Sequence, residues 1–188
     1  MAVLSNKQHI GKYDVTRLIK ENNYCETYRV EDEKEEPFFL KLFILKNTPE
    51  KMLDENHKVA CIDYMSKLRH KNIVSYVEQG TFSDEQVGEC EYVITNYFSG
   101  ELLADKLMRE GSLPLEESIR IINDVLDGLK FMHERNLFHN DITPRNVMLS
   151  ERTAGTAGTA ELIDMSHVSK YIGGSPTFDT SDLDERQD

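Results

Sequence analysis

The sequence predicts an α+β fold in which strands fill most of the first half of the chain and a long helix dominates the second. Apolar and β-branched segments separated by charged turns recur between residues 10 and 94, as in a sheet. From residue 112 onward, proline and acidic residues precede apolar residues spaced three and four apart, as in an amphipathic helix. The sheet and the long helix should therefore form different parts of the fold.

Composition limits the class of protein. The chain has 188 residues, of which 39% are hydrophobic and 30% charged, and this suits one large or two small globular domains. No segment approaches the roughly 20 apolar residues of a membrane span. The first seven residues also lack the apolar stretch of a signal peptide. We therefore expect a cytoplasmic protein that does not bind membranes.

Charge and cysteine content argue against two further classes. The formal net charge of -12 repels a phosphate backbone, so nucleic acid is not an expected partner. Cys25, Cys61 and Cys90 are too few and too far apart for a disulfide framework, and no Cys-x-x-Cys pair suggests zinc. They are expected to be free thiols.

Five strands and one main helix are expected in the first half. A charged turn at residues 31–36 separates two of the strands. Thr48, Pro49 and Glu50 are the residue types of a helix start, and the helical pattern continues to Leu68. The expected strands cover residues 10–19, 24–30, 38–43, 73–77 and 92–94.

The second half should contain the long helix and two short strands. Ser112, Pro114, Glu116 and Glu117 predict the helix start, and Asn136 predicts its end because asparagine tolerates the left-handed conformation. Apolar periodicity predicts one buried stripe, formed by Ile119, Ile122, Leu126 and Leu129. Strands are expected at 146–149 and 161–163, with an exposed loop of small residues at 153–160 between them.

The residues suited to chemistry concentrate between His139 and Asp164. Asp141 and Asn146 lie five residues apart in a loop, and Asp164 ends a following strand. A carboxylate, an amide and a second carboxylate placed in this way can converge on metal ions and a phosphate. Phosphoryl transfer requires such an arrangement because its catalysis is mostly positioning and charge neutralisation.

From about Tyr13 to about Asp184 the chain resembles the catalytic domain of the eukaryotic-type protein kinases. The segment from His70 to Val74 and the later loop from His139 to Asn146 carry the resemblance. It implies a kinase-like fold with a five-stranded antiparallel sheet and one main helix in an N-lobe, residues 1–96. Residues 97–188 would form a partial helical C-lobe.

The resemblance implies a role for each residue of the site. Lys41 would bind the α and β phosphates of ATP, and Asp141 would be the catalytic base that accepts the proton of the acceptor hydroxyl. Asn146 and Asp164 would bind Mg²⁺, with Asp164 as the principal ligand. His139 is expected to be structural.

The resemblance also implies where the rest of the nucleotide would bind. Thr95 would be the gatekeeper, and the backbones of Asn96 and Phe98 would hydrogen-bond to adenine. Asn22 and Tyr24 belong to the loop that would cover the phosphates. Lys20, Asn22 and Cys25 stand where the family has glycines, and a Cβ there restricts the approach of backbone N–H groups to phosphate.

Other departures from the family pattern surround the same site. Cys61 occupies the position of the helix glutamate that pairs with the lysine, so either Glu55 or Asp63 is recruited or Lys41 is held by Asp164 and the phosphates alone. Thr143 replaces a basic residue near the transferred phosphate, and Asn140 replaces an arginine that docks phosphorylated loops. Asp164-Met165-Ser166 replaces Asp-Phe-Gly.

The resemblance ends before the last helices of the kinase fold. Residues 175–181 resemble the middle of an activation segment, and their hydroxyls are expected to be solvated. Without further helices, the apolar stripe of the long helix would have less to pack against. An exposed apolar patch favours a homodimer or a partner protein.

Three functional hypotheses follow. The first is ATP- and Mg-dependent phosphotransfer to protein Ser/Thr hydroxyls, or the nucleotide-binding part of such a kinase. The second is a pseudokinase that acts as a nucleotide-responsive binding or scaffold module. The third, a small-molecule phosphotransferase of the aminoglycoside-kinase type, is disfavoured by the His70–Val74 segment and the activation-like tail.

Overall fold

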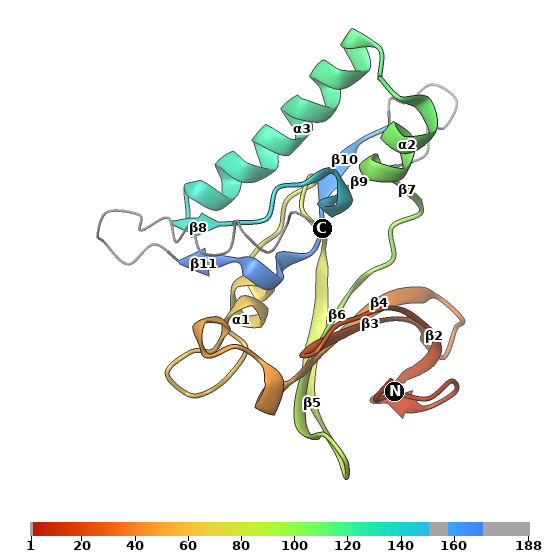
Figure 1. Cartoon of the computed structure of the whole chain (residues 1–188), viewed down its shortest axis with the longest axis vertical. Helices are drawn as coiled ribbons and strands as arrows, with labels where there is room; N and C mark the ends of the chain where they lie inside the picture. The colour runs from red at the N-terminus through yellow and green to blue at the C-terminus, as the bar shows by residue number, and fades with distance from the viewer. Residues whose placement is uncertain (1, 151–157, 171–188) are drawn as a thin grey trace.

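The computed structural model describes residues 2–150 and 158–170. Its largest element is an antiparallel sheet of six strands in the order β1-β2-β3-β4-β6-β5 (Figure 1). The strands are β1 (His9–Ile10), β2 (Tyr13–Glu21), β3 (Cys25–Glu31), β4 (Pro37–Ile44), β5 (Tyr76–Asp84) and β6 (Gly88–Asn96). The β-rich first half is thus as predicted, with one strand more than the five expected.

The additional strand arises because a turn interrupts the segment expected to be one strand from residue 10. Gly11 has φ +60°, a left-handed conformation that glycine adopts without strain. The chain reverses there, and Ile10 pairs with Tyr13. Ile10 is 2% exposed, so burial of its side chain holds the short edge strand on the sheet.

The strand expected from residue 73 begins at Tyr76, because the residues before it pair elsewhere. Ile73 forms a parallel bridge with Leu162, and the Val74 N–H donates to the Leu162 carbonyl at 2.9 Å. The Leu162 N–H in turn donates to the Asn72 carbonyl at 2.9 Å. These bonds join the first half of the chain to a strand of the second half.

The main helix of the first half is much shorter than predicted. Helix α1 covers only Ala60–Ser66, and the preceding region forms two 3-10 turns, η1 (Leu45–Asn47) and η2 (Glu50–Met52). The Asp54 carboxylate accepts hydrogen bonds from the N–H groups of Asn56 and Lys58, which closes a turn where the helix was expected. Aspartate favours such turns over helix interiors because it bonds to nearby backbone.

The second half contains α2 (Leu103–Glu110) and α3 (Leu115–His133), and it builds two small sheets (Figure 1). Helix α3 was predicted and α2 was not. Asn136 has φ +57° just after α3, as its residue type predicted. The remaining elements are β7 (Gly100–Leu102), β8 (Leu137–Phe138), η3 (Pro144–Asn146), β9 (Val147–Ser150), β10 (Ala160–Leu162), η4 (Met165–His167) and β11 (Ser169–Lys170).

Two apolar clusters cover the sheet. One lies within the first half and includes Tyr13, Tyr28 and Leu40, each fully buried. The other contains Phe43 from the sheet and Met132 from α3, both fully buried, together with residues of α1 and β10. Because this second cluster is shared, burial of one apolar core fixes the sheet against the elements that carry the predicted chemistry.

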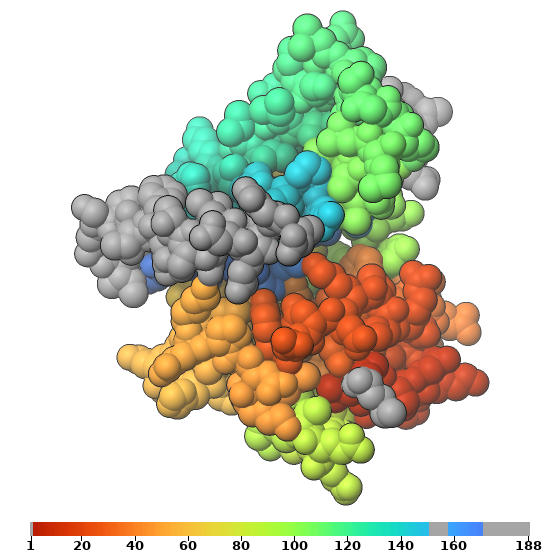
Figure 2. Space-filling view, viewed as in Figure 1, coloured from red at the N-terminus to blue at the C-terminus, as the bar shows by residue number. Residues whose placement is uncertain are grey.

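The predicted buried stripe of α3 is wrong for three of its four residues, whereas the fourth, Leu129, is partly buried and packs against the core. Ile119, Ile122 and Leu126 are 51%, 56% and 55% exposed, while Ile121, Gly128 and Met132 form the buried face. Gly128 lies against Asn72, where an added Cβ would come 3.0 Å from the Asn72 carbonyl oxygen. The helix surface lies along one end of the molecule (Figure 2).

Parts of the sequence-based prediction fall outside the described residues. These are most of the small-residue loop and the activation-like segment with Ser175, Thr177, Thr180 and Ser181. Within the described ranges, no helix has both the length and the apolar character needed to cross a membrane.

Candidate active site

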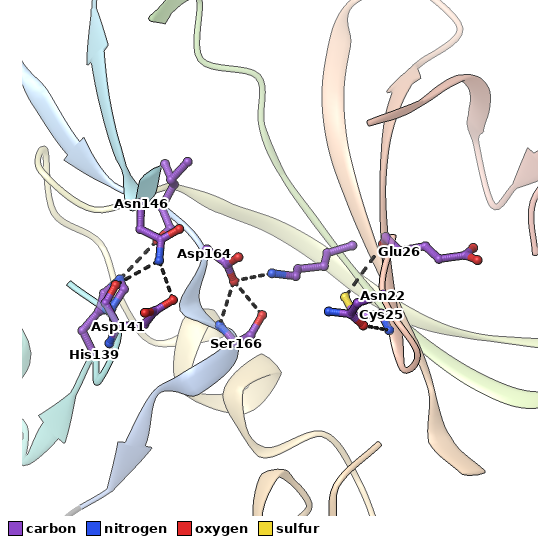
Figure 3. Close-up of polar contacts among 10 residues, drawn as sticks. Asn22, Cys25, Glu26, His139, Asp141, Asn146, Asp164 and Ser166 are labelled. Atoms are coloured by element: carbon purple, nitrogen blue, oxygen red, sulfur yellow. Dashed lines mark hydrogen bonds and ion pairs between the residues drawn. The ribbon is translucent and has the colours of Figure 1, made fainter. Parts of the chain in front are cut away.

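Lys41 and Asp164 come from opposite halves of the fold and form an ion pair. Lys41 is in the middle of β4, and its Nζ bonds to Oδ1 of Asp164, which follows β10. The two side chains are 19% and 21% exposed, so solvent screens this pair only in part. Figure 3 shows Asp164 at the centre of the site, between the sheet and the loop that carries Asp141.

Asp164 has an unusual backbone conformation. Its φ of +58° and ψ of +71° are left-handed, and its side chain caps η4 by accepting from the Ser166 N–H at 3.3 Å. The Ser166 hydroxyl donates to the same carboxylate oxygen at 2.7 Å (Figure 3). A non-glycine residue in this region costs energy, and these bonds hold the carboxylate facing Lys41.

The charges of this pair are mutually stabilised. Burial alone would raise the pKa of the Asp164 carboxyl, but the Lys41 ammonium and the Ser166 hydrogen bond hold that pKa well below its usual range. Burial alone would lower the pKa of Lys41, yet the Asp164 carboxylate raises it above its ordinary value. Both groups are therefore ionised at neutral pH.

The loop from His139 to Asn146 is ordered by its own polar side chains. Asn146 Nδ2 donates to the Asp141 carbonyl at 2.9 Å and to Asp141 Oδ2 at 2.6 Å (Figure 3). His139 Nε2 donates to the Ile163 carbonyl at 3.1 Å, while its Nδ1 accepts from the Asp141 N–H at 3.3 Å. His139 is 1% exposed, and burial lowers the pKa of its imidazole. It therefore holds Asp141 and the strand before Asp164 in register as a neutral side chain.

Asn140 connects this loop to the segment after Asp164. Its φ is +62°, and its Nδ2 lies 2.8 Å from the His167 carbonyl and 2.8 Å from Ser169 Oγ. A neutral amide thus bonds directly to residues near β11. This contact requires no phosphorylated side chain.

The β2–β3 turn covers one side of the site and is closed by Asn22. Asn22 Oδ1 accepts from the N–H groups of Tyr24 at 3.0 Å and of Cys25 at 2.7 Å. Lys20, Asn22 and Cys25 do not have positive φ, so a left-handed backbone does not explain the asparagine in this turn. Side-chain hydrogen bonding explains Asn22 instead.

A small cavity of about 70 Å³ joins these parts. It brings together Asn22, Tyr24, Lys41, Asp141 and Asp164, which come from four separate segments of the chain. Its other lining residues are Lys20, Cys25, Thr27, Ser166 and His167. Lys20, Cys25 and Ser166 were predicted only to replace glycines of the family pattern, and no role was predicted for Thr27 or His167. Lys20 and Thr27 are paired residues of β2 and β3. Once both strands are predicted, this pairing is the signal that could have placed Thr27 beside Lys20 at the site.

Thr95, Asn96 and Phe98 lie at the end of β6 and just beyond it, and they do not line this cavity. Thr95 is buried opposite Phe39 of β4, two positions along that strand from Lys41. The Asn96 N–H donates to the Ser75 carbonyl at 3.0 Å, so that N–H is already used. Phe98 is half-buried and lies against Gly100.

Neither acidic candidate on the α1 side pairs with Lys41. Asp63 is exposed and pairs with Lys67, one helical turn on, and Glu55 is exposed in the turn before α1. Cys61 is 2% exposed and close enough to Lys41 for their charges to interact. Of the two arrangements predicted for Lys41, the structure has the one in which Asp164 holds it.

The oxygen atoms of this site suit a hard cation that also has phosphate ligands. Carboxylate and amide oxygens are what Mg²⁺ prefers, and Mg²⁺ is usually held by one or two protein groups plus phosphates. Because Asn146 Nδ2 is bonded to Asp141, its amide oxygen is the atom left to bind a metal. Within residues 2–150 and 158–170, no group of three or more His, Cys, Asp or Glu side chains could hold a metal without such help.

Comparison with known proteins agrees with this geometry. The family model for the protein kinase domain matches residues 13–182. Serine/threonine-protein kinase H1 of Homo sapiens is 26% identical over 139 residues, which are 73% of this chain and 31% of that protein. CBL-interacting serine/threonine-protein kinase 3 of Arabidopsis thaliana is 28% identical over 149 residues, 76% of this chain and 31% of that protein.

A bacterial relative matches over a shorter range. Serine/threonine-protein kinase PknB of Mycobacterium leprae is 30% identical over 87 residues, 46% of this chain and 14% of that protein. The chain therefore spans about a third or less of the length of these relatives. The family match covers most of the chain, and the chain belongs to the protein kinase domain family.

Proposed function

We propose that this chain binds ATP with Mg²⁺ and transfers its terminal phosphoryl group to serine or threonine hydroxyls of a protein. The observation that carries the proposal is the cavity in which Lys41, Asp141 and Asp164 meet. One cation and two carboxylates at one cavity can align phosphates, hold a metal and accept a proton. These are the parts that phosphoryl transfer needs.

Each residue of the site has a distinct proposed task. Lys41 would release part of its bond to Asp164 and orient the phosphates, and Asp164 with the amide oxygen of Asn146 would hold Mg²⁺. Bound Mg²⁺-ATP supplies the phosphoryl group and neutralises the charge that develops on it. Asp141, oriented by Asn146 Nδ2, would accept the proton of the acceptor hydroxyl. Thr95, Asn96 and Phe98 would contact adenine, with the Asn96 carbonyl rather than its N–H as the bonding group.

The pseudokinase alternative is favoured by a different set of observations. Asn22 uses backbone N–H groups of the covering turn, and Cys61 gives Lys41 no acidic partner on α1. Thr143 puts no positive charge near the transferred group. In this alternative the chain binds nucleotide and signals through a partner protein without useful transfer.

We propose a second copy of this chain as the partner of the exposed α3 face. Ile119, Ile122 and Leu126 are each more than half exposed. Glu116 lies at the acidic start of the helix and Lys130 near its basic end. An antiparallel pair of α3 helices would bury the apolar residues and place each Glu116 near the other copy's Lys130. We also propose a cytoplasmic location.

One paired experiment tests the enzyme against the alternative. We expect ATP with Mg²⁺ to raise the melting temperature, since ligand at 100 times its Kd adds about 2.7 kcal/mol of stability. Asp164→Asn should lose the Mg²⁺-dependent part of that rise. Asp63→Asn is the matched control, because Asp63 is an exposed carboxylate outside the cavity.

Phosphate transfer to a mixed protein substrate is measured in parallel. Asp141→Asn should abolish transfer while ATP still raises the melting temperature. Binding without transfer in the parent would favour the pseudokinase. A parent that neither binds nor transfers would overturn both readings.

A further inference from the structure

Asn22 closes the β2–β3 turn by accepting two hydrogen bonds at one side-chain oxygen atom. Its Oδ1 accepts from the Tyr24 N–H at 3.0 Å and from the Cys25 N–H at 2.7 Å, and its own N–H donates to the Cys25 carbonyl at 2.9 Å. The turn is further tied to β4, because the Ile44 N–H donates to the Tyr24 carbonyl at 2.8 Å. Two neighbouring backbone donors of this turn are therefore occupied by a side chain of the same turn.

The same turn faces the cationic part of the cavity. Asn22, Tyr24 and Cys25 line the cavity together with Lys41, and Lys20 lies at its rim on β2. Figure 3 shows Asn22 beside Cys25 on the sheet side of the site, across from Asp164. Successive backbone N–H groups in a turn form an anion-binding site when they are unoccupied. An anion held by Lys41 would meet donors that Asn22 already satisfies.

We infer that the Asn22 carboxamide competes with the phosphate groups of a bound nucleotide for the N–H groups of Tyr24 and Cys25, and so limits nucleotide affinity. This inference rests on the proposed function. A phosphate oxygen accepts a stronger bond from N–H than a neutral amide does, so phosphate can displace Asn22. Displacement breaks the hydrogen bonds that close the turn. The free energy of those bonds is lost on nucleotide binding, so the affinity is lower.

The consequence is specific to the phosphate part of the ligand. ATP carries the oxygens that would compete with Asn22, whereas adenosine has none. Removing the side-chain acceptor should therefore strengthen ATP binding and leave adenosine binding unchanged. Alanine suffices for this change, because Asn22 is exposed and does not have positive φ.

The turn between β5 and β6 offers a matched control. Asp84 Oδ1 accepts from the N–H groups of Gln86 at 2.8 Å and of Val87 at 2.9 Å, the same two positions relative to the acceptor as in the β2–β3 turn. Asp84 does not line the cavity. Asp84→Ala removes an equivalent turn cap without touching the site.

Titration calorimetry with Mg²⁺-ATP and with adenosine tests the inference on the full chain. We expect Asn22→Ala to bind ATP about three- to tenfold more tightly than the parent, as expected for freeing one or two donors for phosphate. Asn22→Asp keeps the acceptor and adds a negative charge, so it should bind ATP more weakly than the parent. Asp84→Ala should match the parent for both ligands.

Amide hydrogen exchange gives a readout without nucleotide. Asn22→Ala should speed exchange at Tyr24 and Cys25, and ATP should slow it again in the variant. Unchanged ATP affinity in Asn22→Ala, or equal gains for ATP and adenosine, would overturn the inference while leaving the proposed function intact. ATP binding by none of the proteins would overturn both.

Discussion

Lys41 Nζ on β4 and Asp164 Oδ1 after β10 form an ion pair that joins the sheet to the loops of the second half. Each charge is largely removed from water, and each is the main favourable charge near the other. The pair therefore bears on the stability of the fold as well as on phosphate binding.

Replacing one partner of this pair should lower the free energy of unfolding more than replacing both. Lys41→Met leaves the Asp164 carboxylate without its cation, and we expect a loss of about 1–3 kcal/mol of unfolding free energy, below the range for fully buried pairs because both groups keep some solvent. Lys41→Met combined with Asp164→Asn should recover part of that loss. Urea denaturation measures both, and additive losses would contradict a direct interaction.

The same pair predicts how this effect depends on pH. The folded pKa of Asp164 lies below its unfolded value, so its contribution to stability is complete above the unfolded pKa of about 3.9 and is lost as pH falls through the folded pKa. The difference between parent and Lys41→Met should be largest at pH 8 and shrink as pH falls, because burial raises the pKa of the unpaired Asp164 carboxyl in the variant, which can then take up a proton. A difference that grew at low pH would show that another group carries it.

Two other groups, the buried His139 and the partly buried Glu161, should change stability with pH in opposite directions. Burial lowers the pKa of His139, so its neutral form stabilises the fold at high pH and this is lost as pH falls below its unfolded pKa of about 6.5. Burial raises the pKa of Glu161 to about 7, so its contribution is present below the unfolded pKa and is lost as pH rises towards 7.

Glu161→Gln isolates the second effect. The glutamine stays neutral, so the variant should be more stable than the parent at pH 8, by about 1–2 kcal/mol, since the carboxyl is only partly buried and solvent screens its charge. The advantage should disappear below about pH 4, where the parent carboxyl is protonated in both the folded and the unfolded state. Thermal unfolding at both pH values measures this, and an advantage independent of pH would point to packing instead.

A glutamate should destabilise the protein less at position 61 than at position 62 of the same helix. Cys61 and Ile62 are 2% and 3% exposed, and Cys61 lies near enough to Lys41 for their charges to interact. Cys61→Glu should therefore cost about 2 kcal/mol less than Ile62→Glu, whose charge would be buried without a cation. Equal losses would show that α1 holds position 61 too far from Lys41 for pairing.

The three thiols should react slowly while the protein is folded. Burial raises the pKa of Cys25 and of Cys61 to about 12 and that of Cys90 to about 11. The thiolate is the reactive form, so little of it exists at pH 8. Ellman's reagent should label all three thiols within minutes in urea and less than one in native buffer over the same time. Fast native labelling would show that α1 or the β2–β3 turn opens readily.

The sequence predicted the parts of the fold that local pattern determines. Strands β2, β3 and β4 and helix α3 formed where alternation and periodicity placed them, because short-range pattern decides burial along a single element. The predicted length of helix α1 was wrong because the Asp54 side chain closes a turn in the segment before it. Apolar spacing gives no sign of this competition between side-chain and backbone hydrogen bonds.

The sequence predicted which residues form the site but not which contacts they make. The loop from His139 to Asn146 could be recognised from its residues, but the partner of Lys41 depends on how α1 packs, which spacing left open. The role of Asn22 likewise could be seen only in the structure, because it depends on two hydrogen bonds rather than on a left-handed backbone. The outward face of α3 depends on which of two apolar stripes packs on β10, and both stripes have helical spacing.

The exposed stripe of α3 should make the chain self-associate. We expect the parent to sediment as a dimer at tens of micromolar, because the proposed pairing would remove the exposed Ile119, Ile122 and Leu126 from water. Ile122→Glu should give a monomer with little change in melting temperature, since a half-exposed side chain contributes little to the monomer's core. Lys130→Glu should weaken the dimer by like-charge contact with Glu116, and adding Glu116→Lys should restore it. A monomeric parent, or a double variant no better than the single one, would contradict antiparallel pairing of α3.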